Sequence, residues 1–340
     1  MLSLGESDMT KNWLELFPDN IKRLLLNLPM GVLENLEEIR IRESRPLEIN
    51  TGGKFYFISY SGEMILAPEE AYKPSREDGH RLLDLISNHS LYTMEEELRK
   101  GFITIPGGHR IGLTGRTVLS AGRVEHIRDI SGFNVRIAKE IKGVADEILP
   151  YLLDIKKKRV FHTLIMSPPQ HGKTTLVRDL ARQISSGTWG KSNINWPGMK
   201  VGIVDERSEI AGSQRGVPGF DVGPRTDVLD GCPKAEGMMM LLRSMSPDVL
   251  IVDEIGRPED AEAVTEALHA GISVIATAHG SSVQDMRGRP GLAGLVDNRM
   301  FEMYAVLNRS GNERCLKLQD GEQRTLTTAG PRRLGGDVFA

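Results

Sequence analysis

Residues 167–175 contain the side chains in this sequence that are best suited to bind phosphate. They read Ser167-Pro168-Pro169-Gln170-His171-Gly172-Lys173-Thr174-Thr175. An apolar run precedes them at 161–166, and apolar residues recur at helical spacing over 176–182, which predicts strand, loop and helix. Helix N-terminal N–H groups would face the anion, the Lys173 ammonium would reach the β- and γ-phosphates of ATP, and the Thr174 hydroxyl would ligate Mg²⁺. The whole stretch is therefore a candidate nucleotide-binding loop.

The loop departs from the usual phosphate-binding motif at its first position, where Ser167 stands in place of glycine. Glycine permits backbone angles there that serine adopts at some cost. An ordinary strand-to-helix turn with a surface lysine is the alternative interpretation, so further motifs must decide.

Two adjacent acids, Asp253 and Glu254, follow an apolar run at 249–252. A buried strand ending in two carboxylates is typical of a Walker B motif. Asp253 would hold Mg²⁺ through water, and Glu254 would polarise the attacking water. Both motifs in this order favour ATP hydrolysis over a chance pair of acids.

A third apolar run, at 272–276, leads to Thr277 and His279. Both would lie at the carboxyl edge of a parallel sheet, where a side chain can sense the γ-phosphate. We therefore count His279 with Glu254 and Lys173 as candidate catalytic residues, although a capped loop histidine is the simpler interpretation of His279 alone.

A fourth strand is predicted at 200–204, followed by candidates for the metal or water shell: Asp205, Glu206 and Glu209. The segment 207–233 is rich in glycine and proline and is expected to be a long loop, either functional or disordered. Its arginines, Arg215 and Arg225, are either phosphate sensors or ordinary surface residues.

The N-terminal half has a different pattern, with helices broken at Pro18 and alternating strands such as 38–42, 102–105 and 133–137. Helices are also expected over 77–87 and 91–100. Four arginines lie on or beside the predicted strands: Arg110, Arg116, Arg128 and Arg136. They are either solvated, or one or two reach the nucleotide of a neighbouring subunit.

Composition limits the class of protein. The chain has 340 residues and a formal net charge of −3, which argues against a protein built mainly to coat nucleic acid. Two cysteines without CxxC spacing argue against a disulfide framework or a zinc site. We predict neither a signal peptide nor a membrane-spanning segment, and hence a cytoplasmic protein.

These patterns predict an α/β fold in three parts. Residues 1–143 would form a smaller α+β domain, residues 144–325 an ATPase domain with a parallel central sheet, and residues 326–340 a polar tail.

The order of motifs resembles the RecA-like plan of P-loop NTPases. Residues 204–209, 241–257 and 277–280 are similar to the aspartate box, Walker B and histidine boxes of the ATPases of type II and type IV secretion. Asp253 departs from this resemblance, because many secretion ATPases have glycine there.

A closer resemblance covers most of the chain. Segments 38–42, 101–110 and 134–138, with the Ser-Pro-Pro form of the loop, resemble the stage III sporulation AA family of endospore-forming bacteria. The resemblance implies a hexameric, Mg²⁺- and ATP-dependent enzyme in the mother-cell cytoplasm, peripherally associated with membrane-embedded sporulation channel proteins. The resemblance also accounts for serine in place of glycine at position 167, because the Ser-Pro-Pro form of the loop is part of it.

Two alternatives stay open at this stage. A RecA-like ring that threads nucleic acid would need basic loops and an aromatic ladder, and only 207–225 supplies arginines. A scaffold that binds nucleotide without turnover would have no need of Glu254.

Overall fold

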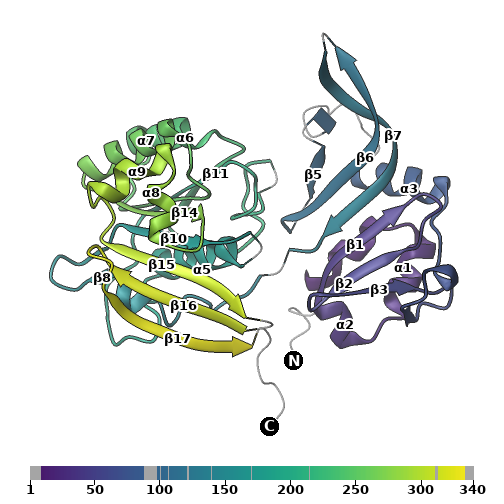
Figure 1. Cartoon of the computed structure of the whole chain (residues 1–340), viewed down its shortest axis with the longest axis horizontal. Helices are drawn as coiled ribbons and strands as arrows, with labels where there is room; N and C mark the ends of the chain where they lie inside the picture. The colour runs from purple at the N-terminus through teal and green to yellow at the C-terminus, as the bar shows by residue number, and fades with distance from the viewer. Residues whose placement is uncertain are drawn as a thin grey trace. The chain divides into compact units, whose positions relative to one another are not determined.

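A computed structural model of the chain divides into two compact units, residues 1–138 and 139–340 (Figure 1). The structure describes residues 9–87, 98–99, 101–105, 107–120, 122–138, 140–169, 171–213, 215–310 and 313–333. The division falls slightly before the predicted domain boundary between residues 143 and 144. In the part of the chain so described, every helix is too short or too polar to cross a bilayer.

The first unit is built on an antiparallel sheet in the order β4-β3-β2-β1-β7-β6-β5. Its strands are β1 (Leu36–Arg42), β2 (Glu48–Thr51), β3 (Lys54–Ile58), β4 (Met64–Ile65), β5 (Phe102–Ile105), β6 (His109–Ser120) and β7 (Arg123–Arg136). Its helices are η1 (Met9–Leu16), α1 (Asp19–Leu26), α2 (Met30–Glu34), η2 (Pro68–Glu70) and α3 (Arg76–Ser87). The helix expected over 91–100 lies outside the described residues, except for 98 and 99.

Alternation in β1 decides which face of this sheet is covered. Ile39 and Ile41 are 0% and 1% exposed and pack with α1 and α3 in one hydrophobic cluster. Arg40 and Arg42 point to the other face, where they pair with Glu38 and Glu48. A period of two with one apolar face is the signature of a half-buried strand, so this strand prediction is confirmed.

A buried histidine, His109, begins β6 in this unit. Its Nδ1 accepts the N–H of Ala138 at 3.1 Å, its exposed fraction is 9%, and burial lowers its pKa to about 4. Since the unfolded chain binds a proton near pH 6.5, stability present above that pH is lost as the pH falls toward 4, by about 3 kcal/mol.

His109→Gln keeps an acceptor but cannot titrate, so we expect it to remove this part of the pH dependence. Urea unfolding of both proteins between pH 4 and 7 measures the difference. Parallel stability curves would contradict the assignment.

The second unit is built on an eight-stranded sheet in the order β12-β11-β13-β14-β10-β15-β16-β17. Its strands are β10 (Thr163–Ser167), β11 (Val201–Asp205), β12 (Thr226–Asp230), β13 (Val249–Val252), β14 (Ser273–His279), β15 (Met303–Ser310), β16 (Glu313–Asp320) and β17 (Thr325–Arg333), with a separate ribbon of β8 (Leu153–Asp154) and β9 (Arg159–Val160). Its helices are η4 (Leu149–Leu152), α5 (Lys173–Ser186), α6 (Lys234–Ser244), α7 (Pro258–His269), α8 (Val283–Arg287) and α9 (Pro290–Asp297).

In sheet order, strands β12, β11, β13, β14, β10 and β15 run parallel to one another. Strands β15, β16 and β17 then pair as an antiparallel meander. The predicted parallel central sheet is therefore confirmed.

Two expectations were wrong. The polar tail predicted from residue 326 begins with β17, which pairs with β16, and the loop predicted over 207–233 contains β12. Both strands lack the strong apolar runs that mark the sheet centre.

Helices cover both faces of this sheet (Figure 1). In β10, Ile165 packs into one hydrophobic cluster with α5, whereas Leu164 and Met166 pack into a second cluster with α6, α7, α8 and α9. Continuous apolar strands such as β10 and β13, buried along their whole length, are what two covered faces require. This three-layer arrangement brings the strand ends, with their polar residues, to one edge.

Candidate nucleotide-binding site

The loop between β10 and α5 carries the predicted phosphate-binding residues. Gly172 is the N-cap of α5 and has φ +86°, a left-handed conformation that glycine adopts without strain. The N–H groups of the first turn of α5 have no acceptor within the helix, so this end carries partial positive charge. Backbone geometry here suits an anion.

Lys173 is the central side chain of the loop. Its Nζ lies 3.0 Å from the Ser167 carbonyl oxygen, 3.1 Å from Ser167 Oγ and 3.3 Å from the Pro168 carbonyl oxygen. Lys173 is only 6% exposed, and burial lowers its pKa while Asp253 and Glu254 oppose that shift. A buried ammonium gains from an anion placed beside it, because few waters solvate it.

The remaining described residues of the loop flank Lys173 in the sequence. His171 Nδ1 lies 2.7 Å from the Pro169 carbonyl oxygen, and Thr174 and Thr175 are half-buried in the first turn of α5. Gln170 lies outside the described residues. Their roles in binding a nucleotide stay predictions.

Asp253, Thr174 and Thr277 form the second part of the site. Thr277 Oγ1 donates a hydrogen bond to Asp253 Oδ1, and the Thr174 hydroxyl lies 3.4 Å from Asp253 Oδ2. Burial raises the pKa of Asp253. A carboxylate in this position gains from a nearby cation, which would also favour its charged form.

Glu254 has an unusual backbone and two ionic partners. Its φ is +52°, which is uncommon for a residue with a side chain, and its N–H donates to Thr277 Oγ1 at 2.8 Å. Glu254 Oε1 lies 2.9 Å from His279 Nε2, and Oε2 lies 2.8 Å from an Arg207 terminal nitrogen. The backbone thus turns this carboxylate toward His279 and Arg207.

His279 joins the two halves of the site. Its Nδ1 lies 3.1 Å from Lys173 Nζ, while Nε2 faces Glu254. An ammonium can only donate, so Nδ1 accepts from Lys173 and Nε2–H donates to Glu254 in the neutral ring. The ring therefore connects Lys173, the predicted phosphate-binding lysine, to the candidate base.

Strand pairing explains why these residues meet. Ser167 at the end of β10 is directly opposite His279 at the end of β14, and β14 pairs in parallel with β13, which precedes Asp253. Carboxyl ends of adjacent parallel strands share one edge of the sheet, which is where α/β proteins bind ligands.

Other sequence candidates have different roles. Asp205 is 1% exposed, and its oxygens accept the N–H groups of Glu209, Ile210 and Ala211, so its observed role is to fix the turn after β11. Glu206 pairs with Lys234.

Of the two loop arginines, Arg225 lies apart from the predicted phosphate-binding turn. Arg225 binds Ser185 at the C-terminal end of α5, which lies about 20 Å along the helix from Gly172. It therefore does not reach a phosphate bound at the N-terminal end of α5. Arg215 is exposed.

Sequence reasoning missed Arg207. It follows directly after the acids at the end of β11, but only the adjacency of β11 and β13 brings it to Glu254. A loop arginine beside two acids is too common a pattern to reveal this contact.

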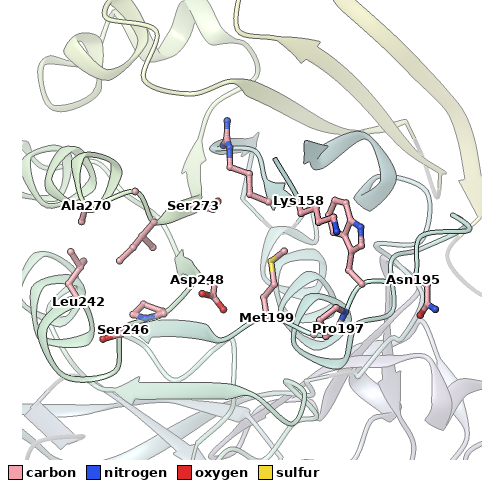
Figure 2. Close-up of a pocket in the computed structure, with 15 residues that line it drawn as sticks. Lys158, Asn195, Pro197, Met199, Leu242, Ser246, Asp248, Ala270 and Ser273 are labelled. Carbon is pink, nitrogen blue, oxygen red and sulfur yellow. The ribbon is translucent and has the colours of Figure 1, made fainter. Parts of the chain in front are cut away.

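A pocket of about 800 Å³ lies at the opposite edge of the same sheet (Figure 2). Its lining includes Lys158, Trp196, Met199 and Asp248, from segments that precede β9, β11 and β13. None of the predicted nucleotide or catalytic residues lines it, so it is a separate feature from the candidate site.

The donor set at the candidate site fits Mg²⁺ bound together with a nucleotide. Within the described ranges, no group of three or more His, Cys, Asp or Glu side chains is arranged to hold a metal. Mg²⁺ usually takes one or two carboxylates and completes its shell with waters and substrate phosphates. Asp253 and the Thr174 hydroxyl supply such a partial shell.

Comparison with known proteins places the chain in a family. The family model described as sporulation stage III, protein AA, matches residues 7–320. The stage III sporulation protein AA of Bacillus subtilis (strain 168) is 49% identical over 296 residues, which is 87% of this chain and 90% of the relative.

Solved structures of ATPases share the fold. The ATPase DotB of Yersinia pseudotuberculosis has a TM-score of 0.53 at 13% identity, over 85% of this chain and 76% of that chain. The pilus retraction motor PilT with bound ADP has a TM-score of 0.52 at 15% identity, over 85% and 79% of the two chains. The predicted RecA-like fold preceded by a smaller α+β unit is thereby confirmed.

Proposed function

The chain belongs to the sporulation stage III, protein AA family, and from this premise we propose that it is a Mg²⁺-dependent ATPase acting on the membrane-embedded sporulation channel complex. One observation carries the proposal. A buried lysine, a histidine and two acids meet at the carboxyl edge of a RecA-like sheet, in one continuous network of contacts. This network supplies an anion site, a cation site and a candidate base within one cluster.

Each residue has a role that its contacts support. Lys173 binds the β- and γ-phosphates, Thr174 and Asp253 hold Mg²⁺, and Glu254 accepts the proton of the attacking water. Bound Mg²⁺ would supply charge neutralisation at the phosphate oxygens. His279 transmits a change at Lys173 to Glu254, because its two ring nitrogens contact both side chains.

The assembly and its setting are part of the same proposal. By analogy with secretion ATPases we propose a hexamer in the mother-cell cytoplasm, bound peripherally to the channel. Arg110 and Arg136, and likewise Arg116 and Arg128, are cross-strand neighbours on β6 and β7. Like charges directly opposite each other are unfavourable, so an anion near either pair would be stabilising. We propose that one of these four arginines contacts the nucleotide bound by a neighbouring subunit.

The test of the proposed function is phosphate release from ATP by the purified full-length protein, with the oligomer mass recorded alongside. Mg²⁺-dependent release by an assembly larger than a dimer is the expected result. Nucleotide binding without turnover, even after addition of channel proteins, would overturn the ATPase proposal in favour of a scaffold. Salt-sensitive binding of an oligonucleotide that stimulates turnover would favour a nucleic-acid motor.

Arg207 provides a sharper test of how Glu254 is held. We expect Arg207→Ala to lower kcat by roughly tenfold with little change in KM, because the carboxylate loses the partner that orients its Oε2. Arg207→Lys should retain an intermediate rate. Arg215→Ala changes an exposed arginine of the same loop and is the matched control. Equal losses in Arg207→Ala and Arg215→Ala, or a change confined to KM, would rule out this role.

A further inference from the structure

α6 and α7 lie in the outer helical layer of the second unit (Figure 1). A groove of about 730 Å³ is lined by residues of both helices. Its apolar lining consists of Ala235, Met239, Met240 and Ala263. Its charged lining consists of Glu236, Glu259, Glu262, Glu266 and Arg243. We call this feature the α6–α7 groove.

The methionines of α6 divide between core and groove. Met238 is 0% exposed and fills the core, but Met240 is 52% exposed and Met239 is half-buried at the edge of the hydrophobic cluster. Unbranched, polarisable methionine side chains adapt to the shape of a docked apolar surface.

The charge of the groove is strongly one-sided. Its four glutamates and one arginine give a net charge of −3, and within the described residues none of the four glutamates forms an ion pair. By contrast, Glu206 forms an ion pair with Lys234 at the start of α6. A negatively charged groove disfavours nucleic acid and acidic lipid surfaces.

The glutamates of α7 repel one another. Glu259, Glu262 and Glu266 are three and four residues apart, so they lie along one face of the helix. Like charges at these spacings destabilise a helix, and Glu266 in the last turn also opposes the helix dipole. Cations laid along this face would relieve both effects.

We propose that the α6–α7 groove binds a basic amphipathic helix of a partner protein. Apolar side chains of that helix would contact Met239 and Met240, while flanking lysines or arginines would face the glutamates, the mode by which amphipathic helices occupy apolar grooves. α6 and α7 have 11 and 12 residues, so the groove suits a ligand of about three turns. Such binding does not require nucleotide turnover.

The groove is also well placed to affect the nucleotide site. α6 leads into β13, and α7 begins at Pro258, shortly after the acids Asp253 and Glu254. A ligand that shifts either helix would therefore move the segment that carries the candidate base. This second step rests on the proposed function, whereas binding itself does not.

The probe for the test is a fluorescein-labelled peptide of about 14 residues, with leucines along one helical face and lysines elsewhere. A scrambled peptide of equal composition lacks the amphipathic face. Anisotropy titrations with the full-length protein compare the wild type with the triple variant Glu259→Lys, Glu262→Lys and Glu266→Lys. The matched control reverses three exposed glutamates of the first unit: Glu34→Lys, Glu69→Lys and Glu70→Lys.

We expect the amphipathic peptide to bind the wild type and to bind the α7 variant at least about tenfold more weakly, with the control variant unchanged. Met240→Glu, which alters an exposed side chain and spares the core, should also weaken binding. Equal binding of the scrambled peptide, equal loss in the control variant, or no binding to the wild type would overturn the proposal. An altered oligomer mass in the α7 variant without peptide would instead identify the groove as a contact between copies of this chain.

Discussion

Glu254→Gln is expected to lower the rate of ATP hydrolysis by roughly 10²- to 10⁴-fold while leaving ATP binding nearly unchanged. Glutamine has the shape of glutamate, so the hydrogen bond from the residue 254 N–H to Thr277 Oγ1 and the packing of the turn should persist. The substitution removes the proton acceptor, together with the negative charge and one of the two acceptor oxygens that face Arg207 and His279. The variant should therefore retain bound ATP that the wild type converts to ADP, and both quantities are measured by phosphate release and by analysis of the nucleotide bound after gel filtration.

Glu206→Gln is the matched control for Glu254→Gln. Both glutamates follow parallel strands at the same sheet edge, but Glu206 pairs with Lys234 and lies outside the network around Lys173. We expect its rate to stay within a few-fold of the wild type. A wild-type rate of ATP hydrolysis in Glu254→Gln would show that Glu254 is not the base. A large loss of rate in Glu206→Gln would show that the acids after β11 take part in the reaction.

Much of this arrangement could be predicted from local sequence patterns. The central strands are continuous apolar runs, and the loop before α5 contains glycine, lysine and threonine at the spacing that phosphate binding requires. The polar residues that end these strands were therefore predicted as candidates, and the structure brings Lys173, Glu254 and His279 into contact. Local pattern was sufficient because each of these elements is specified by its own residues.

Strand order was not available from the same patterns. His279 meets Lys173 because β14 lies beside β10, and Arg207 meets Glu254 because β11 lies beside β13. These adjacencies arise from packing of the whole sheet, which no single segment encodes. β17 was missed for a related reason, since a polar edge strand gains its stability from pairing with β16 and has little apolar signal of its own.

Asp205 illustrates how a correct pattern can have a different meaning. An acid at the end of a buried strand was expected near the metal, but its oxygens accept three backbone N–H groups and fix the turn that follows. Arg178 of α5 stabilises the same turn, because its guanidinium donates hydrogen bonds to the Glu209 and Ile210 carbonyl oxygens. Arg207 lies between Asp205 and the three backbone N–H donors in the sequence, so Asp205 fixes the backbone of the turn that carries Arg207.

Lys173→Met is expected to weaken MgATP binding by roughly 100-fold and to abolish turnover. The ammonium is the only side-chain cation in contact with the phosphate-binding turn among the described residues of the loop, and charge-assisted hydrogen bonds contribute about 1.5–3 kcal/mol each. Methionine fills nearly the same volume, so the effect measures the lost charge and not a cavity. Titration calorimetry with MgATP measures the affinity directly.

The thermal stability of Lys173→Met separates this effect from misfolding. Burial lowers the pKa of Lys173, which means that the folded protein holds the ammonium at a cost. Replacing it with an apolar side chain should therefore leave Tm unchanged or raise it, even as nucleotide affinity falls. Lys156→Met, which changes an exposed lysine after β8, should alter neither quantity. If Lys173→Met bound MgATP as the wild type does, the nucleotide would have to bind elsewhere; if Tm fell sharply, the lysine would be a structural residue whose buried contacts hold the loop together.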